Sequence, residues 1–474
     1  MTDVASLGLL SVMPPVVAIV LAIWTKQVYL SLFAGIWIAW TILNDWNPLL
    51  GAIQSVDELI AVFGDADNTM IILLTVMIGA LLTFTQFSGG MSGLVTFMTD
   101  RGLVRTRRSA GLLAWMISVV VFVESTIGPL VSGAVTRPLF DKLRISREKL
   151  SYILDSTCSC KAMMIPLNTW GAYVVGLLVA QGVESPVRLL ALSLPLNFYG
   201  LLTLVVSLII AVTALEFGPM AVAERRVREE GKVLRDGAEP LVATEALAVT
   251  VKEGVDPRAR NMVVPVGTVV LSLPILLWIT GGGDIMAGAG TASAFWSVIL
   301  GLTVGGLMYR VQGIMSLHEI TDMFMKGVGG LIPVGVLLVL AFGIGDASQA
   351  LGTGPYVAQV TEAGLSPALV PAALFIVSGV IAFSTGTSFG TWAIMIPIVI
   401  PMTALMDLHA GLAVSAVIGG GLFGDHTSPI SDSTIIATMA AGADHVDHVR
   451  TQLPYASAVA GVALVLYLGF GFVL

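Results

Sequence analysis

The sequence predicts an all-α protein that crosses a membrane many times. Of its 474 residues, 56% are hydrophobic and 11% are charged, whereas soluble domains are nearer to about 25% charged. The mean hydropathy is +0.92, and apolar stretches recur from one end of the chain to the other. This pattern favours a polytopic protein over a soluble one with a single anchor. The net charge of −8 is spread over loops and indicates no nucleic-acid partner.

Most of the apolar segments are long enough to span, because a helix of about 20 residues crosses the hydrocarbon core. They are 7–24, 27–43, 69–87, 151–181, 187–215, 261–280, 284–309, 328–345, 411–440 and 453–474. Two further regions, 109–140 and 370–401, are broken halfway by "ESTIGP" and "STGTSFGT". Their arms of about 14–16 residues are short for a full span. We interpret both as re-entrant hairpins, since irregular backbone at membrane depth is tolerated only inside protein or beside a wet cavity.

The clearly soluble segment, 217–260, contains "AERRVREEGKVLRDGAEP" and predicts a short surface helix followed by a linker. It separates two halves that match at a constant offset, for example at Thr126 and Thr387. Basic residues support an inverted repeat. Loops 101–108 and 141–149 are rich in Arg and Lys, but their second-half counterparts contain none. The positive-inside rule then places these first-half loops in the cytoplasm and their counterparts outside.

The sequence therefore predicts two membrane repeats of about five spans each, an odd number as inversion requires. The first repeat covers 1–216, with a re-entrant hairpin at 109–140 and a broken helix at 151–181. A cytoplasmic linker follows at 217–260. The second repeat covers 261–474, with its hairpin at 370–401 and its broken helix at 411–440. Both termini are expected outside, and the acidic residues between 45 and 67 are expected in an outer loop.

Inverted repeats with broken helices are typical of secondary transporters, whose sites lie at the midplane between the repeats. No "GxxxxGK[ST]" motif occurs, which argues against an ATP-driven pump. No nucleophile–base set or metal-ligand spacing in the sequence predicts an enzyme.

Four polar clusters interrupt the apolar text, and polar groups at membrane depth need a reason. The first hairpin tip contains Glu124, Ser125 and Thr126. The stretch that begins "DSTCSCK" contains Asp155, Ser156, Thr157, Lys161 and Asn168. The second hairpin tip contains Thr385, Gly386, Thr387 and Ser388. The stretch "DHTSPISDST" contains Asp425, His426, Thr427, Ser428, Ser431, Asp432, Ser433 and Thr434.

These residue types suit Na⁺, a hard cation that prefers carboxylate, hydroxyl and free carbonyl oxygens. The expected Na⁺ ligands are Asp425, Asp432, Thr387 and Asp155. Half-helix N-termini at the hairpin tips would suit an anionic group. A buried carboxylate also binds H⁺ readily, because desolvation favours its neutral form. Competition of Na⁺ and H⁺ for one carboxylate would be sufficient for antiport.

Each cluster also has a simpler explanation. Ser and Thr hydroxyls in helices often bond the preceding turn, and Asp155 could start a helix near the cytoplasmic surface. His426 could carry protons or only donate a structural hydrogen bond. Lys161 could pair with Asp155 or Glu124, take the place of a bound cation, or accept a substrate carboxylate. The stretch "ADHVDHVR", 443–450, resembles a metal cluster, but we favour a solvated loop.

Three strings closely resemble hallmarks of the NhaC family of Na⁺/H⁺ antiporters: "RPLFDKLRISREKLSYILDST", "FSTGTSFGTWAIMIPIVIP" and "FGDHTSPISDST". The resemblance implies an inverted-repeat fold with a scaffold part, a mobile transport part and a homodimer. It implies ion-binding roles for Asp155, Ser156, Thr157, Thr385, Thr387, Asp425, His426, Ser428, Asp432 and Thr434. Two departures matter. The first hairpin tip has one carboxylate, Glu124, where typical members have an acidic pair, and Lys161 follows "DST" where small apolar residues are typical.

We therefore expect a secondary transporter of the prokaryotic inner membrane that works by alternating access. The leading function is Na⁺/H⁺ antiport, with Na⁺ and H⁺ as coupling ions and no cofactor. The less acidic first half leaves an alternative, Na⁺- or H⁺-coupled transport of a small organic anion or amino acid. A passive channel is the third hypothesis. The expected partners are the lipid bilayer and the transported ion or solute.

Overall fold

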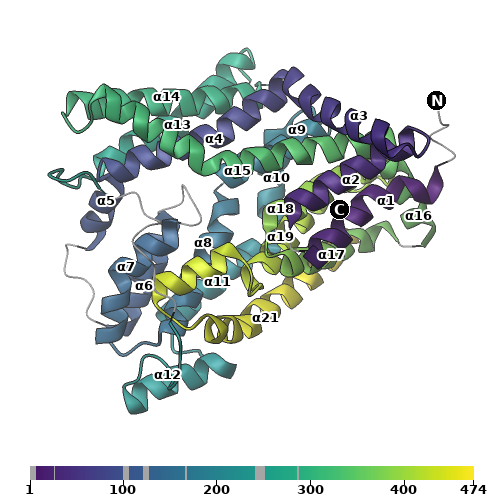
Figure 1. Ribbon diagram of the computed structural model, residues 1–474. Helices are drawn as coiled ribbons and strands as arrows, with labels where there is room; N and C mark the ends of the chain where they lie inside the picture. Colours follow the sequence, from purple (N-terminus) through teal and green to yellow (C-terminus); the bar gives the residue numbers. More distant parts are fainter. Residues whose placement is uncertain are drawn as a thin grey trace.

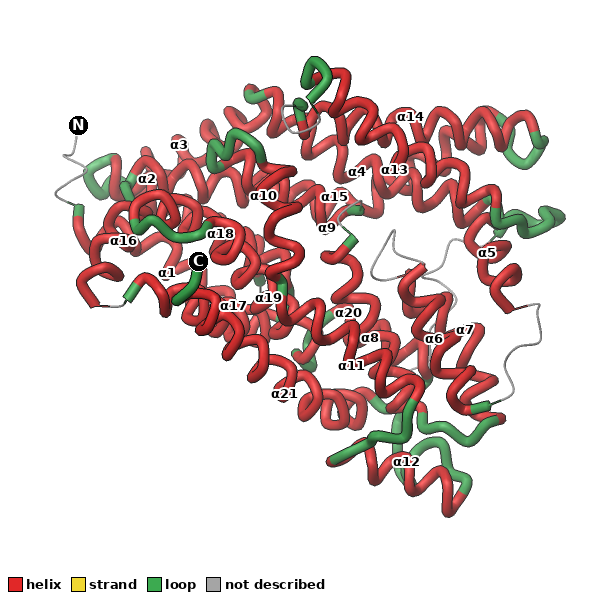
Figure 2. Tube along the Cα trace, turned by 180° about the vertical axis from the view of Figure 1, so that it is seen from behind, coloured by secondary structure: helices red, strands yellow, loops and turns green. Residues whose placement is uncertain are grey.

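The computed structural model describes residues 7–25, 27–99, 106–120, 127–165, 168–240, 251–284, 288–364 and 366–474. These residues are almost entirely helical, as Figures 1 and 2 show. Within the described ranges the only β pairing is an isolated bridge between Pro240 and Asp444. Among the described residues, seven helices are long and apolar enough to cross a membrane, or up to ten if each of three bent pairs is one span. The prediction of an all-α polytopic membrane protein is confirmed.

The described part of the first half contains eleven α-helices. They are α1 (Met13–Thr25), α2 (Val28–Leu43), α3 (Pro48–Ala61), α4 (Ala66–Phe87), α5 (Gly90–Thr99), α6 (Arg107–Val120), α7 (Ile127–Lys142), α8 (Arg147–Met164), α9 (Thr169–Ala180), α10 (Pro186–Ser193) and α11 (Phe198–Val212). The short helix expected in the linker is α12 (Gly218–Glu230).

Nine α-helices lie within the described residues of the second half. They are α13 (Arg260–Thr280), α14 (Gly290–Val311), α15 (Leu317–Ala350), α16 (Thr353–Gly364), α17 (Val370–Thr385), α18 (Ser388–Leu405), α19 (Ala410–Thr427), α20 (Asp432–Ala441) and α21 (His445–Gly471).

Helix α3 differs from the sequence expectation of an acidic outer loop. It is bent by 120° from α2. Asn47 caps it by accepting hydrogen bonds from the N–H groups of Leu49 and Leu50. Its apolar side chains, including Leu49, Ile53 and Ile60, are exposed on the protein surface. An amphipathic helix with an exposed apolar face suits a position along a membrane surface. The sequence predicts a loop here because acidic residues lie between the apolar ones.

Helices α13, α14 and α15 all pack against α4. In Figures 1 and 2, α13 and α14 lie along the upper edge with α4, and α12 projects at the lower edge beside α21. Helix α4 packs directly on α15. A Cβ built on Gly79 of α4 would lie 2.2 Å from the carbonyl oxygen of Gly327 of α15. The two backbones are therefore in contact, and only glycine fits at this crossing.

Two helix breaks and two helix pairs define the polar centre. Helices α8 and α9 meet at an angle of 44°, and α19 gives way to α20 across residues 428–431. Helices α17 and α18, of 16 and 18 residues, occupy the place of the predicted second hairpin, and the segments Pro367–Thr385 and Ser388–Leu405 are each long and apolar enough to cross a membrane. Helices α6 and α7 pack together as the arms of the first hairpin, while its tip, 121–126, lies outside the described residues.

Candidate ion-binding site

The tip of the second hairpin lies directly against the break between α19 and α20. Helix α17 ends at Thr385 and is capped by Gly386, which has a φ of +68° and donates its N–H to the Ala382 carbonyl at 2.8 Å. A Cβ on Gly386 would lie 2.9 Å from the Ile430 carbonyl oxygen. Both the positive φ and the close approach require glycine here. Thr387 then caps α18 by accepting a bond from the Gly390 N–H at 3.4 Å.

Asp425 is the charged group at this junction. Its Oδ2 accepts hydrogen bonds from the Ser388 N–H at 3.1 Å and the Ser388 hydroxyl at 2.7 Å. Its Oδ1 accepts one from the Ser431 hydroxyl at 2.5 Å. The carboxylate therefore lies at the N-terminus of α18, where free N–H groups and the helix dipole favour negative charge. The sequence predicted an anionic group at this hairpin tip, and in the structure the protein's own Asp425 lies there.

A cavity of about 780 Å³ reaches Asp425 from the side of α4 and α15. Asp425 is only 7% exposed, but Asp432, at the first position of α20, is exposed to this cavity. Lys326 of α15 contributes the opposite charge to the lining. Aromatic and polar side chains complete the wall, and they include Tyr29, Thr83, Gln86, Trp170, Thr387, Phe389 and Ser433. Pockets of about 300–1,000 Å³ are typical of small-molecule sites.

Several predicted ligands have simple local bonds. The hydroxyls of Thr385 and Thr427 donate to Ile381 and Phe423, each the carbonyl of the preceding turn, at 2.8 and 2.5 Å. The Ser428 hydroxyl donates to the Phe383 carbonyl at 2.7 Å and thereby holds the break against α17. The remaining hydroxyls bond groups next to the break. The hydroxyl oxygens of Ser433 and Ser431 are 3.0 Å apart, and the Thr434 hydroxyl donates to the His426 carbonyl at 3.1 Å.

The ring of His426 is fully buried and lies outside the cavity lining. Its Nδ1 lies 2.9 Å from the Leu422 carbonyl, and its Nε2 lies 3.1 Å from the Tyr199 hydroxyl. These contacts favour the structural explanation of this histidine over a proton carrier that faces the pore.

Asp155 lies inside the protein on α8 and is 0% exposed. The Ser159 hydroxyl donates to its Oδ1 at 3.3 Å, and His448 Nε2 and Gln452 Nε2 contact its Oδ2 at 3.2 and 2.8 Å. The alternative that Asp155 starts a helix at the surface is wrong. Our favoured interpretation of 443–450 as a solvated loop is also wrong, because His448 belongs to α21 and is fully buried.

The other first-half candidates connect helices. The Lys161 ammonium is buried and donates to the Ser118 carbonyl of α6. The Asn168 side chain caps α9 and donates to the Ala162 and Ile165 carbonyls at the end of α8. The Thr157 hydroxyl donates to Ser207 at 3.3 Å, and Ser156 is fully buried. None of the described first-half candidates lines the cavity, and Glu124, Ser125 and Thr126 lie outside the described residues.

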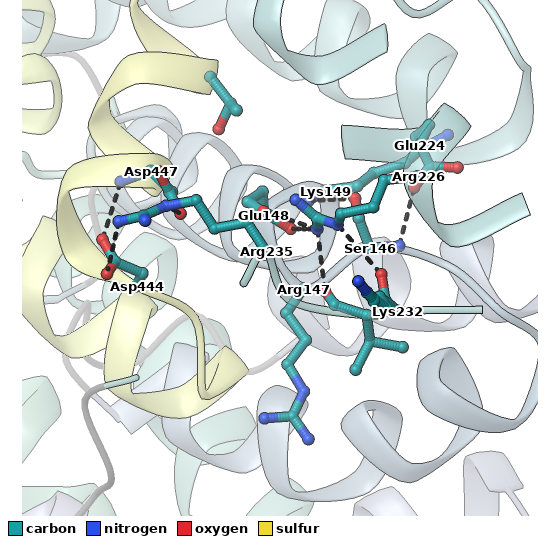
Figure 3. Close-up of polar contacts among 12 residues, drawn as sticks. Ser146, Arg147, Glu148, Lys149, Glu224, Arg226, Lys232, Arg235, Asp444 and Asp447 are labelled. Carbon is teal, nitrogen blue, oxygen red and sulfur yellow. Dashed lines mark hydrogen bonds and ion pairs between the residues drawn. The ribbon is translucent and has the colours of Figure 1, made fainter. Parts of the chain in front are cut away.

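An ion-pair network that the sequence did not predict joins the linker to both halves (Figure 3). Arg226 of α12 pairs with Glu148 of α8 at 2.9 Å. Arg235 pairs with Asp447 at 2.5 Å and with Asp444 at 3.4 Å, at the start of α21. Both contacts join acidic residues at the starts of α8 and α21 to arginines of the basic linker. The sequence contains these charges, but it does not show that they lie close together.

The linker network also includes a carboxylate with a shifted pKa. Glu216, just before α12, contacts Lys149 at 2.7 Å and Arg228 at 3.0 Å. Burial opposes its ionisation, but these two cations outweigh burial and hold the pKa of this carboxyl below its usual range.

Comparisons with known proteins agree with this architecture. Residues 184–472 match the model of the Na⁺/H⁺ antiporter family. An uncharacterized protein of Haemophilus influenzae is 30% identical over 488 residues, which cover 98% of this chain and 91% of that protein. The malate-2H⁺/Na⁺-lactate antiporter of Bacillus subtilis is 25% identical over 205 residues, which cover 43% of this chain and 40% of that protein.

A solved structure shares the fold. The structure of MtrF from Neisseria gonorrhoeae, described as illuminating a class of antimetabolite efflux pumps, matches with a TM-score of 0.59 and 16% identity. The match covers 90% of this chain and 85% of that one. At this identity the likeness concerns the arrangement of helices.

Proposed function

Because the chain belongs to the Na⁺/H⁺ antiporter family, we propose that it exchanges Na⁺ for H⁺ by alternating access in the inner membrane of a prokaryote. Its family and its named relatives are transporters, not enzymes. The observation that supports an ion site is the Asp425 carboxylate, held by Ser388 and Ser431 at the meeting of a hairpin tip and a helix break.

Na⁺ and H⁺ compete for Asp425 in this proposal. A serine hydroxyl donates one hydrogen bond but also offers lone pairs, so Ser388 and Ser431 can turn their oxygens toward a bound cation. Thr387 and Asp432 line the same cavity and add oxygen ligands. When H⁺ binds the carboxylate instead, the negative charge that attracts Na⁺ is lost, and Na⁺ leaves. The Ser388 and Ser431 hydroxyls then form hydrogen bonds with the neutral carboxyl group. Each turnover then couples the two ions without a further cofactor.

The proposed organisation keeps the two inverted repeats, 1–216 and 261–474, with the linker in the cytoplasm. Helices α4, α13, α14 and α15 make the scaffold, and the hairpins with the broken helices make the mobile transport part. The cavity between α15 and the second hairpin tip is where movement of one part against the other would change access. A homodimer held through the scaffold is part of this proposal.

A second candidate function follows from the size and charge of the cavity. A volume of about 780 Å³ exceeds what a single ion needs and suits a small organic solute. Lys326 would attract a carboxylate, while Asp432 would attract an ammonium group or the coupling cation. The Bacillus subtilis relative is named for exchange of malate and lactate with H⁺ and Na⁺. This candidate is Na⁺- or H⁺-coupled transport of an organic anion or amino acid.

Proteoliposomes with an imposed Na⁺ gradient test both functions. We expect the wild type to move protons against the Na⁺ flux, and Asp425→Asn to abolish this movement while eluting as a folded protein. Asp256→Asn, on the exposed end of the linker, is the matched control. A wild type that moves no protons overturns antiport. Gradient-driven uptake of labelled malate, lactate or arginine would then favour the second candidate, and uncoupled conductance would indicate a channel.

A further inference from the structure

Protein groups contact both oxygens of the buried Asp155 carboxylate. Its Oδ2 contacts both His448 Nε2 and Gln452 Nε2 of α21, and its Oδ1 accepts the Ser159 hydroxyl bond. His448 and Asp155 are 0% exposed, and Gln452 is 1% exposed. A carboxylate that binds a transported ion must present a lone pair to a space that the ion can enter. Asp155 is absent from the lining of the cavity that contains Asp425 and Asp432.

Gln452 extends this contact to the second half of the chain. The same amide nitrogen that contacts Asp155 also donates to the carbonyl of His426. The Thr434 hydroxyl donates to that carbonyl too, at 3.1 Å. This carbonyl belongs to the last turn of α19, where the break leaves it without a helical partner. Its residue is the direct neighbour of Asp425. One side chain of α21 therefore joins Asp155 of α8 to the backbone that positions Asp425.

We infer that Gln452 is a positioning residue for the ion site, and that Asp155 is its anchor and not a Na⁺ ligand. Gln452 fixes the end of α19, so that the Asp425 carboxylate stays aimed at the cavity and at the start of α18. Asp155 and His448 fix the Gln452 amide. This inference rests on the proposed ion site at Asp425, and it replaces the ligand role that the sequence suggested for Asp155.

The two roles of Asp155 predict different outcomes for Asp155→Asn. An asparagine oxygen accepts the bonds from His448 and Gln452, and its amide donates to Ser159, so an anchor tolerates the change. We expect this variant to keep about a third or more of the maximal exchange rate, with an unchanged half-saturating Na⁺ concentration. A Na⁺ ligand would lose its charge, and Na⁺ transport would disappear.

Gln452→Leu tests the positioning role directly. We expect the half-saturating Na⁺ concentration for proton exchange to rise roughly fivefold or more, since one hydrogen bond is worth about that factor. The double variant Gln452→Leu/Asp155→Asn should resemble Gln452→Leu within about twofold, because both changes act on one contact. Gln349→Leu is the matched control, since this exposed glutamine bonds the Ala180 carbonyl and the Gln181 side chain and does not line the cavity.

A residue that only stabilises the fold would lower the unfolding temperature and the yield but leave the half-saturating Na⁺ concentration unchanged. That result for Gln452→Leu overturns the inference, as does loss of Na⁺ transport in a well-folded Asp155→Asn. If Gln452→Leu does not purify as a monodisperse protein, Gln452→Met, with an unbranched chain, takes its place under the same criteria. A wild type without Na⁺-driven proton flux overturns the proposed function and this inference together, whereas a normal Gln452→Leu overturns the inference alone.

Discussion

Removing the Ser388 hydroxyl tests whether Asp425 is held ready for a cation. In Ser388→Ala the carboxylate keeps the backbone N–H bond of 3.1 Å but loses the hydroxyl bond of 2.7 Å. Hydrogen bonds to charged groups contribute about 1.5–3 kcal/mol. If the hydroxyl oxygen contributes as much to the bound cation, the half-saturating Na⁺ concentration rises roughly 10- to 150-fold, because 1.4 kcal/mol is about tenfold.

The assay is Na⁺-driven proton movement in proteoliposomes over a range of Na⁺ concentrations. Thr403→Val is the matched control, because it removes a hydroxyl of the same helix that bonds only the Ile400 carbonyl, at 2.8 Å. Ser431→Ala should act in the same direction as Ser388→Ala, since Ser431 bonds the other oxygen of Asp425. A half-saturating concentration unchanged in both serine variants would refute the reasoning that these hydroxyls prepare Asp425 for the cation.

Three further predictions concern packing, substrate and pH. Gly79→Ala should lower the unfolding temperature, because its Cβ would lie 2.2 Å from the Gly327 carbonyl and overpacking costs about 1–3 kcal/mol; a melt in detergent checks this. Lys326→Gln should leave Na⁺/H⁺ exchange intact, whereas uptake of an organic anion should fall if Lys326 binds it. Proton movement and uptake of a labelled organic anion, measured in the same proteoliposomes, check this. Glu216→Gln should be less stable than wild type at pH 7. Because the pKa of Glu216 is lowered in the folded protein, the difference in stability between the variant and the wild type should be lost as the pH falls below 4.5. Thermal unfolding measured at several pH values checks this.

The apolar helices and the grouping of the second-half polar residues could be predicted because their signals are local. Apolar runs of sufficient length are read from neighbouring residues, and Gly386 and Pro429 mark breaks within stretches of Ser, Thr and Asp. The contact between Asp155 and His448 could not be predicted in the same way. It joins residues 293 positions apart, and the charges around His448 indicate a surface loop until α21 is seen to continue inward.

The two halves differ in where their carboxylates sit relative to the breaks, and this difference is the reason for proposing an ion site in the second half. Asp425 lies in the last turn of α19, two residues before its end at Thr427, where backbone carbonyls are released from helical bonding. Asp155 lies in the middle of α8, which continues regularly to Met164. A cation at Asp155 would find helical backbone with its carbonyls already bonded, and side chains of α21 in place of open space. In our proposal the first half therefore contributes a carboxylate that is bonded by protein groups, and the second half contributes the oxygens at the edge of the cavity.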